Sequence, residues 1–261
     1  MKLRYVKLDE VPSTNTYVKE YAASLASGTV VYTPCQTAGR GWATNRWESE
    51  PGKNLSFTIL FKPTALPAAS QWLVSEAVAI GLIGGIRRVT GLDDLKIKWP
   101  NDIYAGDRKL AGILIENTIT GENLGHCVIG VGLNVNQSVF VSDAPNPVSL
   151  CQLLGTELDL DEVLQSVCGE ILGLLDTVDD EANKNNLPLL SMVSNTAYMR
   201  HLYRNDSEPH PWEDVAAGRR FDGIVREVTS DGHLVLEDIA TRECRTFAFK
   251  QVKHLIGDII I

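Results

Sequence analysis

The sequence lacks the residue patterns of several common classes of site. Its five cysteines include no C-x-x-C pair, which argues against a disulfide framework and against a zinc site with the usual ligand spacing. Its five histidines have no i,i+4 partner, so a histidine metal cluster is not expected. A G-x-S-x-G nucleophile elbow and a G-x-x-x-x-G-K-[ST] phosphate loop are also missing. The cysteines are therefore expected to be reduced, as in a cytoplasmic protein.

Positive charge is scarce overall and unevenly distributed. The 261 residues include 24 Lys and Arg against 33 Asp and Glu, a formal net charge of −9. Residues 113–196 hold 1 basic and 12 acidic side chains, whereas residues 35–112 hold 10 basic and 7 acidic ones. An acidic chain is a poor general nucleic-acid binder, because phosphate binding needs a surplus of Lys and Arg on one face. The basic stretch still allows a local nucleotide pocket.

The features of secreted and membrane proteins are also not evident. Residues 1–5 run into polar sequence without an apolar core, so no signal peptide is expected. The longest apolar stretch, residues 77–86, is too short and too rich in glycine to span a membrane. With 44% apolar residues, the sequence predicts a globular protein that builds its core without disulfides or metals.

Local patterns predict an α+β protein. Ser13 or Thr14 is expected to cap a helix that reaches about residue 25, and residues 68–89 have the apolar face of a long helix. Strands are expected at residues 29–33, 54–61, 96–99, 109–116 and 126–135, and helices dominate residues 148–190. This succession favours a mixed or antiparallel sheet flanked by helices over strict βαβ winding.

A smaller unit is expected at the end of the chain. Residues 221–228, 233–237 and 246–252 alternate at period two, and Ser-Asp-Gly at residues 230–232 is a hairpin signal. These patterns favour a small all-β module of roughly 60 residues. The sequence therefore predicts two domains, residues 1–196 and residues 197–261.

Residues 130–135, Gly-Val-Gly-Leu-Asn-Val, invite comparison with a dinucleotide-binding fingerprint. The third glycine is missing, and the pattern stays extended with no capped helix after it, so we reject that interpretation. Glycines inside a strand are instead typical of a place where a ligand or another backbone approaches closely.

Basic side chains occur next to glycines and strand ends in three blocks. Gln36, Arg40 and Arg46 belong to a long loop, and such a loop inside a compact domain is more often functional. Residues 98–102, Lys-Trp-Pro-Asn-Asp, follow a strand, and residues 109–112, Lys-Leu-Ala-Gly, open the next one. Arg and Lys beside glycine N–H groups suit phosphate or carboxylate binding, and Asp102 suits a Mg²⁺–phosphate site. Each block alone is compatible with a solvated surface, but their combination favours function.

Taken together, these blocks resemble the biotin protein ligases, or biotin–[acetyl-CoA-carboxylase] ligases. The matching blocks are Ser13-Thr14-Asn15, Gln36-Thr37-Ala38-Gly39-Arg40-Gly41 with Trp47, Lys98-Trp99-Pro100-Asn101-Asp102, residues 109–116 (KLAGILIE) and residues 130–136 (GVGLNVN). The resemblance is strong over residues 8–137 and weaker towards the C-terminal module. It implies a class II synthetase-like fold of the biotin/lipoate ligase type with a small C-terminal SH3-like β-barrel.

The activity implied by the resemblance is a two-step ligation. ATP activates biotin to biotinyl-5′-AMP, and the biotin is then transferred to a lysine of a biotin carboxyl carrier domain. ATP and biotin would be substrates, Mg²⁺ the cofactor and the carrier protein the partner. The resemblance implies a cytoplasmic enzyme without a membrane partner and leaves a homodimer open. Because only about 12 residues precede the first block, too few for a winged-helix domain, a monofunctional ligase without DNA binding is expected.

Residue roles follow from the same resemblance. Lys109, Arg40 and Asp102 are the expected catalytic residues. Lys109 and Arg40 would supply the cations that a reaction between two anions needs, and Asp102 is also the expected Mg²⁺ ligand. The expected biotin-binding residues are Ser13, Thr14, Asn15, Gln36, Arg40, Gly41, Trp47, Lys109 and Gly112. The expected nucleotide-binding residues are Trp42, Arg46, Lys98, Asn101, Asp102, Gly130, Gly132 and Asn134.

The loop after Gly41 departs from the family's usual G-R-G-R-x-G-R-x-W pattern. Trp42 replaces an Arg, Thr44 and Asn45 stand at the later Gly and Arg positions, and Arg46 comes one place late. We hypothesise that Trp42 stacks on the adenylate while Arg46 supplies the charge. Residues 38–50 are expected to become ordered when biotinyl-AMP binds.

Two alternative functions stay open at this point. A lipoate–protein ligase or octanoyltransferase would share the architecture, although the Lys-Trp-Pro-Asn-Asp block and the C-terminal β module favour biotin. A non-catalytic biotin-sensing or adenylate-binding protein is favoured only by the altered loop of residues 40–47.

Overall fold

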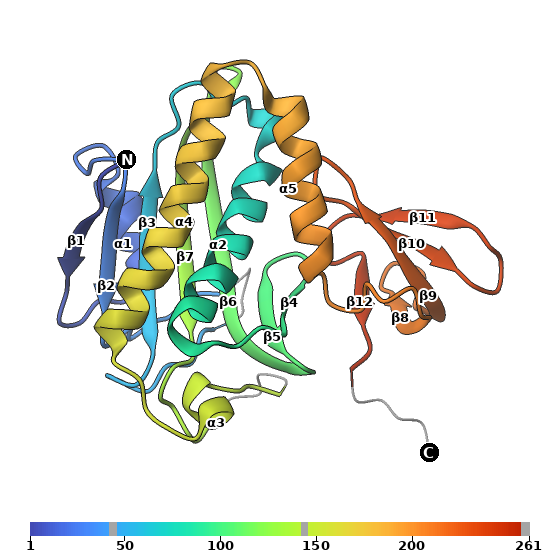
Figure 1. Ribbon diagram of the computed structural model, residues 1–261, viewed down its shortest axis with the longest axis horizontal. Coiled ribbons are helices and arrows are strands. Elements are labelled where there is room, and N and C mark those ends of the chain that lie inside the picture. The colour runs from blue at the N-terminus through green and yellow to red at the C-terminus, as the bar shows by residue number, and fades with distance from the viewer. Residues whose placement is uncertain (42–45, 142–145, 257–261) are drawn as a thin grey trace.

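The computed structural model describes residues 1–41, 46–141 and 146–256. Within these ranges, the chain forms a seven-stranded sheet covered by helices, followed by a five-stranded sheet (Figure 1). The order of the first sheet is β1-β2-β3-β7-β6-β5-β4. Its strands are β1 (Arg4–Lys7), β2 (Thr29–Thr33), β3 (Leu55–Phe61), β4 (Leu95–Lys98), β5 (Asp102–Ala105), β6 (Arg108–Thr120) and β7 (Asn123–Leu133).

Hydrogen-bond pairing makes the first sheet mixed. β1 runs parallel to β2, and the other neighbouring strands are antiparallel. All seven residues of β3 are buried, which explains its nearly continuous apolar sequence, LSFTILF. The continuous strand β7 contains Gly130 and Gly132, so the rejection of a dinucleotide-binding turn is confirmed. The predicted α+β class with a mixed sheet is confirmed as well.

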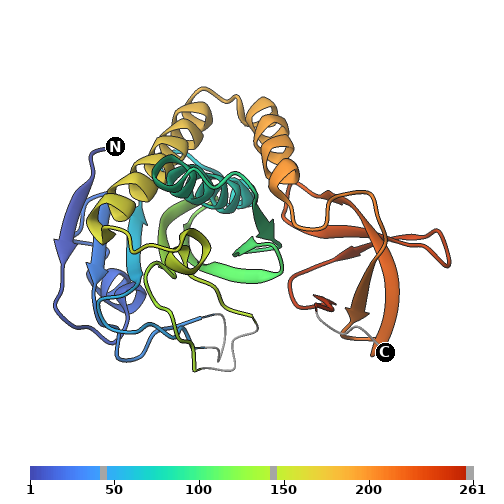
Figure 2. The same cartoon turned by 60° about the horizontal axis from the view of Figure 1, so that its bottom comes forward.

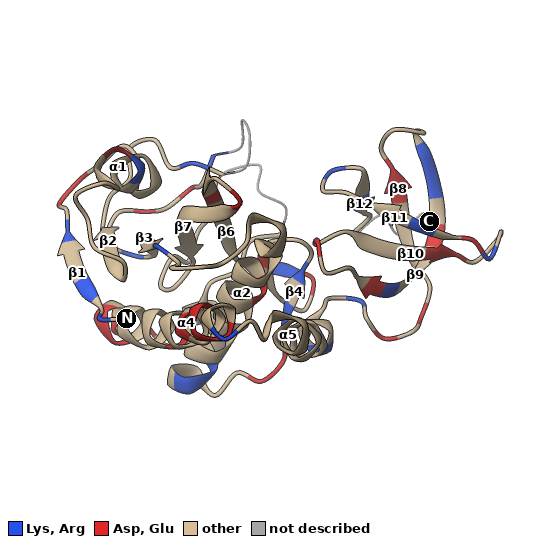
Figure 3. Cartoon of the chain, turned by 90° about the horizontal axis from the view of Figure 1, so that it is seen from above, with Lys and Arg blue, Asp and Glu red and all other residues tan. Residues whose placement is uncertain are grey.

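Helices lie on both faces of this sheet. Figure 3 shows α1 on one side and α2, α4 and α5 on the other, and seven of the 12 acidic side chains of residues 113–196 belong to α4. The helices are α1 (Thr14–Tyr21), the 3-10 turn η1 (Ala68–Ser70), α2 (Trp72–Thr90), α3 (Leu150–Leu154), α4 (Leu160–Asn183) and α5 (Leu187–His201). The charge of −11 in residues 113–196 therefore lies mainly on a helix that is separated from α1 by the sheet.

Helix α2 is the long apolar helix of the core. By length and composition alone, residues 68–90 could cross a membrane. Only residues 77–86 were expected to form the apolar stretch, so the length of this apolar segment was underestimated. However, 61% of the most apolar window of this segment is buried inside the protein. Two glycines bring α2 close to α4: a Cβ at Gly85 would lie 2.4 Å from Cα of Val167, and one at Gly81 would lie 2.7 Å from Cα of Ile171. This burial is the packing of a core helix.

The predicted C-terminal β unit is confirmed as a five-stranded antiparallel sheet, ordered β11-β10-β9-β8-β12. Figure 2 shows it beside the β4–β5 edge of the first sheet, where Trp99 Nε1 donates to the Gly232 carbonyl at 2.9 Å. Its strands are β8 (His210–Asp214), β9 (Arg219–Val228), β10 (Leu234–Asp238), β11 (Cys244–Phe247) and β12 (Val252–His254). The domain boundary between residues 196 and 197 stays a prediction, and α5 runs across it.

Several element boundaries differ from the sequence expectations. The first helix ends at Tyr21 rather than near residue 25. β1, β5 and β8 were not predicted, because their sequences, RYVK, DIYA and HPWED, give little periodic signal. Residues 246–252, predicted as one strand, divide between β11 and β12, since Lys250 has a left-handed φ of 68° that interrupts an extended chain. The five cysteines are free, as predicted.

Candidate active site

A cavity of about 530 Å³ opens beside the N-terminus of α1. Trp42 lies outside the described residues, as do the hypothesis built on it and part of the loop expected to become ordered. Every other predicted site residue lines the cavity, although their roles stay predictions. These residues are Ser13, Thr14, Asn15, Gln36, Arg40, Gly41, Arg46, Trp47, Lys98, Asn101, Asp102, Lys109, Gly112, Gly130, Gly132 and Asn134.

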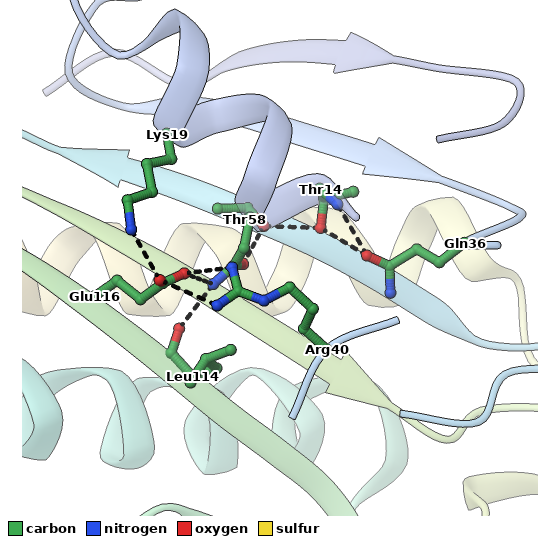
Figure 4. Close-up of polar contacts among 8 residues, drawn as sticks. Thr14, Lys19, Gln36, Arg40, Thr58, Leu114 and Glu116 are labelled. Carbon is green, nitrogen blue, oxygen red and sulfur yellow. Dashed lines mark hydrogen bonds and ion pairs between the residues drawn. The ribbon is translucent and has the colours of Figure 1, made fainter. Parts of the chain in front are cut away.

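One end of the cavity carries an uncharged hydrogen-bond chain (Figure 4). Gln36 Oε1 accepts from the Thr14 backbone N–H at 2.9 Å, and Thr14 Oγ1 lies 2.8 Å from Thr58 Oγ1. Thr58 Oγ1 also lies 2.7 Å from Asn15 Oδ1, so the Thr58 hydroxyl can donate to Thr14 or to Asn15, and the Thr14 hydroxyl donates to Gln36 Oε1 at 3.2 Å. Asn15 Nδ2 donates in turn to the Leu114 carbonyl at 3.2 Å. These hydrogen bonds use the Gln36 Oε1 oxygen and leave the two Nε2 protons available to a ligand.

Ser13 is an N-cap residue whose side chain does not cap. Its backbone is extended ahead of α1, as expected, but no hydrogen bond joins its hydroxyl to the helix, contrary to the predicted cap. The residue is 2% exposed, and Oγ has no hydrogen-bond partner among the described residues. Leaving a buried hydroxyl unpaired costs about 1–3 kcal/mol. Because Ser13 lines the cavity, the missing partner points to a ligand.

Two glycines of β7 make room for side chains at the cavity floor. A Cβ at Gly130 would lie 2.0 Å from Asn15 Oδ1, and one at Gly132 would lie 2.2 Å from the Trp47 ring. The sequence suggested that these glycines admit a ligand, but in the structure protein side chains take that space. They therefore make room for Asn15 and Trp47, which both line the cavity.

Cationic side chains line another part of the cavity. Lys109 Nζ lies 2.7 Å from Asp102 Oδ1 and 5.9 Å from the centroid of the Trp47 ring. The Lys109 backbone is held by hydrogen bonds to Asn146 and Val148, which fix the origin of this side chain. The ammonium and the carboxylate are thus both presented to the cavity, already paired with one another.

Lys98 adds a second ammonium group near this end. It stands opposite Asp102 in the β4–β5 ladder, and both residues line the cavity. Burial lowers the pKa of Lys98, and the positive charges of Lys109 and Arg204 add to this effect, whereas Asp102 opposes it. An anion bound here would relieve the repulsion among these cations.

Arg40 and Arg46 belong to the two described ends of the glycine-containing loop. Their backbones form an isolated antiparallel bridge, and Trp47 N–H donates to the Gly39 carbonyl at 3.1 Å. Arg40 also makes a two-point contact with Glu116, with Nη1–Oε2 at 3.1 Å and Nη2–Oε1 at 3.3 Å. The predicted catalytic Arg40 is therefore held by a partner that the sequence did not reveal.

Two of the predicted nucleotide-binding residues also hold backbone in place. Asn101 Nδ2 donates to the Ile113 carbonyl at 2.6 Å, and Asn134 Nδ2 donates to the Val148 carbonyl at 3.0 Å. Their amide N–H groups therefore shape the strands around the cavity, which is a structural role that the motif alone did not indicate.

Further cavity residues were not singled out by the sequence. Phe249 comes from the C-terminal β unit, and its ring meets Trp99 edge-to-face with centroids 6.1 Å apart. Phe140 and Pro147 come from the segment after β7. Phe249 is 150 residues beyond Trp99, and no local pattern marks such a distant contact. Glu116 does not line the cavity but contacts Arg40, which does, and it could have been noticed because it ends the KLAGILIE block.

The donor set for a metal ion is small. Within the described ranges, no group of three or more His, Cys, Asp and Glu side chains could hold a metal. Asp102 supplies one carboxylate, already paired with Lys109. Mg²⁺ commonly binds through one or two carboxylates together with substrate phosphates. The residues present therefore fit a Mg²⁺ ion that arrives with a nucleotide.

Comparison with known proteins identifies the family. The model of the Biotin/lipoate A/B protein ligase family matches residues 8–134. The bifunctional ligase/repressor BirA of Escherichia coli (strain K12) is 29% identical over 233 residues, which cover 88% of this chain and 68% of that protein. The biotin–[acetyl-CoA-carboxylase] ligase of Paracoccus denitrificans is 30% identical over 162 residues, which cover 60% of this chain and 67% of that protein.

Solved structures show the same fold. The biotin protein ligase from Aquifex aeolicus in complex with biotin and ATP superposes with a TM-score of 0.74 at 20% identity, covering 97% of this chain and 99% of the other. This agreement extends over both sheets. The chain therefore belongs to the biotin/lipoate A/B protein ligase family.

Proposed function

We propose that this chain is a biotin–protein ligase, which activates biotin with ATP and transfers it to a lysine of a biotin carboxyl carrier protein. The observation that carries the proposal is one cavity with two chemically different ends. One set of lining residues is neutral and hydrogen-bonding and includes the unpaired Ser13 hydroxyl, and another set supplies the cations of Lys109 and Lys98. Biotin has the same polarity, with a neutral ureido ring at one end and a carboxylate at the other.

The neutral end suits the ureido ring. Gln36 Nε2 supplies protons for the ureido oxygen, while the hydroxyl oxygens of Ser13 and Thr14 accept from its N–H groups. Trp47 covers the apolar part of the ligand. A site built from such buried polar groups discriminates against analogues that leave those groups unpaired.

The cationic end suits the first chemical step. A biotin carboxylate oxygen attacks the α-phosphorus of ATP, the bond from that phosphorus to the bridging oxygen breaks, and pyrophosphate leaves. Lys109 and Arg40 stabilise the charge that develops on the α-phosphate, and Arg46 and Lys98 offset the remaining phosphate charge. Mg²⁺, when bound, would neutralise phosphate charge, with Asp102 as its carboxylate ligand.

The second step transfers the acyl group. The neutral amine of the carrier lysine attacks the acyl carbon of biotinyl-5′-AMP, the bond from that carbon to the phosphate oxygen breaks, and AMP leaves. The amine nitrogen loses one proton to solvent or buffer as the amide forms. Asp102, at the same end of the cavity, orients the attacking amine.

The test is transfer of labelled biotin to a purified carrier domain with ATP and Mg²⁺. The expected result is a label that resists denaturation and requires ATP. Pyrophosphate release without transfer would favour an adenylate-forming sensor instead.

Thermal unfolding tests whether the protein binds biotin or lipoate, because a ligand at about 100 times its Kd adds roughly 2.7 kcal/mol of stability. Stabilisation by lipoate alone would contradict the proposal.

The proposal extends to the setting of the enzyme. We place it in the cytoplasm and assign no DNA-binding activity to these 261 residues, whose net charge is −9. Salt-dependent binding to an operator duplex at nanomolar protein would contradict this assignment. Sedimentation with and without biotinyl-AMP would decide between a monomer and a homodimer.

A further inference from the structure

Glu116 joins three separate parts of the chain through contacts that include Asn15 and Arg40 of the cavity lining. Its carboxylate, on β6, receives hydrogen bonds from Asn15 Nδ2 at 3.3 Å and Lys19 Nζ at 3.2 Å, both on α1, and from Arg40 on the glycine-containing loop (Figure 4). The side chain of Glu116 is 21% exposed and that of Arg40 is 44% exposed. A largely covered carboxylate thus fixes a much more exposed guanidinium.

The geometry restrains Arg40 in direction as well as in distance. Two nearly parallel N–H···O contacts hold the plane of the guanidinium, which a single contact would leave free to turn. A long Arg side chain otherwise loses rotamer freedom when a ligand binds, and holding it beforehand removes that cost from binding. The remaining guanidinium protons stay available to a ligand in the cavity.

Asn15 connects this contact to the neutral end of the cavity. Its Oδ1 accepts from Thr58 and its Nδ2 donates to Glu116 Oε2, so one amide ends the hydrogen-bond chain and supports the carboxylate. Lys19 is 59% exposed and supplies a second positive charge to Glu116. The carboxylate therefore stays compensated even while Arg40 contacts an anion.

Building on the proposed ligase function, we propose that Glu116 is a positioning residue that holds Arg40 in place for the anionic groups of biotin and ATP. Glu116 itself touches neither substrate. Its effect on the reaction passes through Arg40, and this dependence distinguishes positioning from general structural support.

A double-mutant cycle tests that dependence. The variants Glu116→Gln, Arg40→Ala and the double variant are compared with wild type by ATP–pyrophosphate exchange with biotin. Glu116→Gln is expected to lower kcat/KM about tenfold, the size of a lost charge-assisted contact. In the double variant, the loss should equal that of Arg40→Ala alone. Losses that multiply would show that Glu116 acts independently of Arg40 and would overturn the proposal.

A second measurement does not depend on activity. Arg40 is labelled with phenylglyoxal in the ligand-free chain and followed by mass spectrometry, with the thermal midpoint of each variant recorded. Glu116→Gln should speed labelling of Arg40 several-fold, whereas Lys19→Met, which removes the other cation from the same carboxylate, should leave it unchanged. Equal labelling in wild type and Glu116→Gln would overturn the proposal. An inactive wild-type chain would instead contradict the ligase function.

Discussion

The two ends of the cavity reach a fixed geometry by different means. At the neutral end, hydrogen bonds join buried groups from α1, β3 and the segment after β2, with the Thr58 hydroxyl between Thr14 and Asn15. Among the charged lining residues, two cations are already paired with carboxylates, Lys109 with Asp102 and Arg40 with Glu116. The neutral end therefore holds a fixed set of donors and acceptors, whereas the charged end has to share its cations between protein and substrate.

The largest expected effect lies at the charged end. Removing one group that stabilises transition-state charge costs about 10²–10³ in kcat, so Lys109→Met should lower biotin adenylation by that factor. The matched control is Lys96→Met on β4, because Lys96 pairs with Asp94 at 3.2 Å and is not among the residues that line the cavity. Pyrophosphate exchange measures both. A loss at Lys109 no larger than that at Lys96 would contradict its assigned role.

A smaller, more selective effect is expected at the neutral end. Gly130→Ala places a Cβ 2.0 Å from Asn15 Oδ1, so Asn15 has to move and the hydrogen-bond chain loses its end. Losing contacts worth about 1–3 kcal/mol corresponds to a biotin affinity lower by roughly 10- to 100-fold. Calorimetric titration should show this loss for biotin and a smaller one for ATP.

The control for Gly130→Ala is Gly169→Ala on α4. A Cβ at Gly169 meets no atom within 4 Å, so this substitution should leave biotin binding unchanged and stabilise the helix by about 0.5–1 kcal/mol. Unchanged biotin affinity in Gly130→Ala would show that Asn15 is not part of the biotin site.

Two buried hydroxyls of β3 offer a matched comparison within the neutral end. Thr58→Val leaves Asn15 Oδ1 without its donor, and an unpaired buried group costs about 1–3 kcal/mol of stability. Ser56 Oγ is buried with no partner among the described residues, so Ser56→Ala should cost little or even stabilise. Urea unfolding measures both free energies. Equal losses would mean that the hydrogen-bond chain does not contribute to stability.

The smallest effect concerns the pH dependence of the Arg40–Glu116 pair. Burial alone would raise the pKa of Glu116, but the hydrogen bonds from Asn15 and Lys19 and the charge of Arg40 outweigh it and lower the pKa below 4.5. A carboxyl whose pKa is lowered by folding adds to the free energy of unfolding at pH values above its unfolded-state pKa of 4.5. This contribution is lost as the pH falls through the lower pKa of the folded state. Because Arg40 and Lys19 are exposed, the gain should stay below about 1 kcal/mol.

Thermal unfolding from pH 7 to pH 3 checks this sign. The stability difference between wild type and Glu116→Gln should be largest at neutral pH and shrink in acid. A difference that grows as pH falls would contradict the assigned direction of the pKa shift.

Strongly patterned segments were predictable, and weakly patterned ones were not. β2 was predicted at its observed limits, because five successive residues with four β-branched side chains leave little alternative to a buried strand. β5 and β8 were missed, since each is held by pairing with neighbours rather than by its own pattern. The break at Lys250 is a local backbone conformation, which the alternating residues around it did not indicate.

Site residues were predictable where they belong to a recognisable sequence motif. Lys109, Asp102 and Gln36 belong to blocks whose residue types suit anion or amide recognition, and all three line the cavity. The contacts of Arg40 with Glu116 and of Trp99 with Phe249 were not predictable, because they join residues 76 and 150 positions apart. Spacing along a chain carries no information about such distances in space.

The sequence by itself determined the class of the fold, the family blocks and the separation of charge between a basic stretch and an acidic helix. Each depends on residue identity or local period, which the chain carries directly. Only the tertiary structure decided that the Ser13 hydroxyl stays unpaired, that Gly130 and Gly132 make room for Asn15 and Trp47, and that a carboxylate holds Arg40. Those features arise when the sheet brings distant segments within hydrogen-bond range and excludes water from the groups between them.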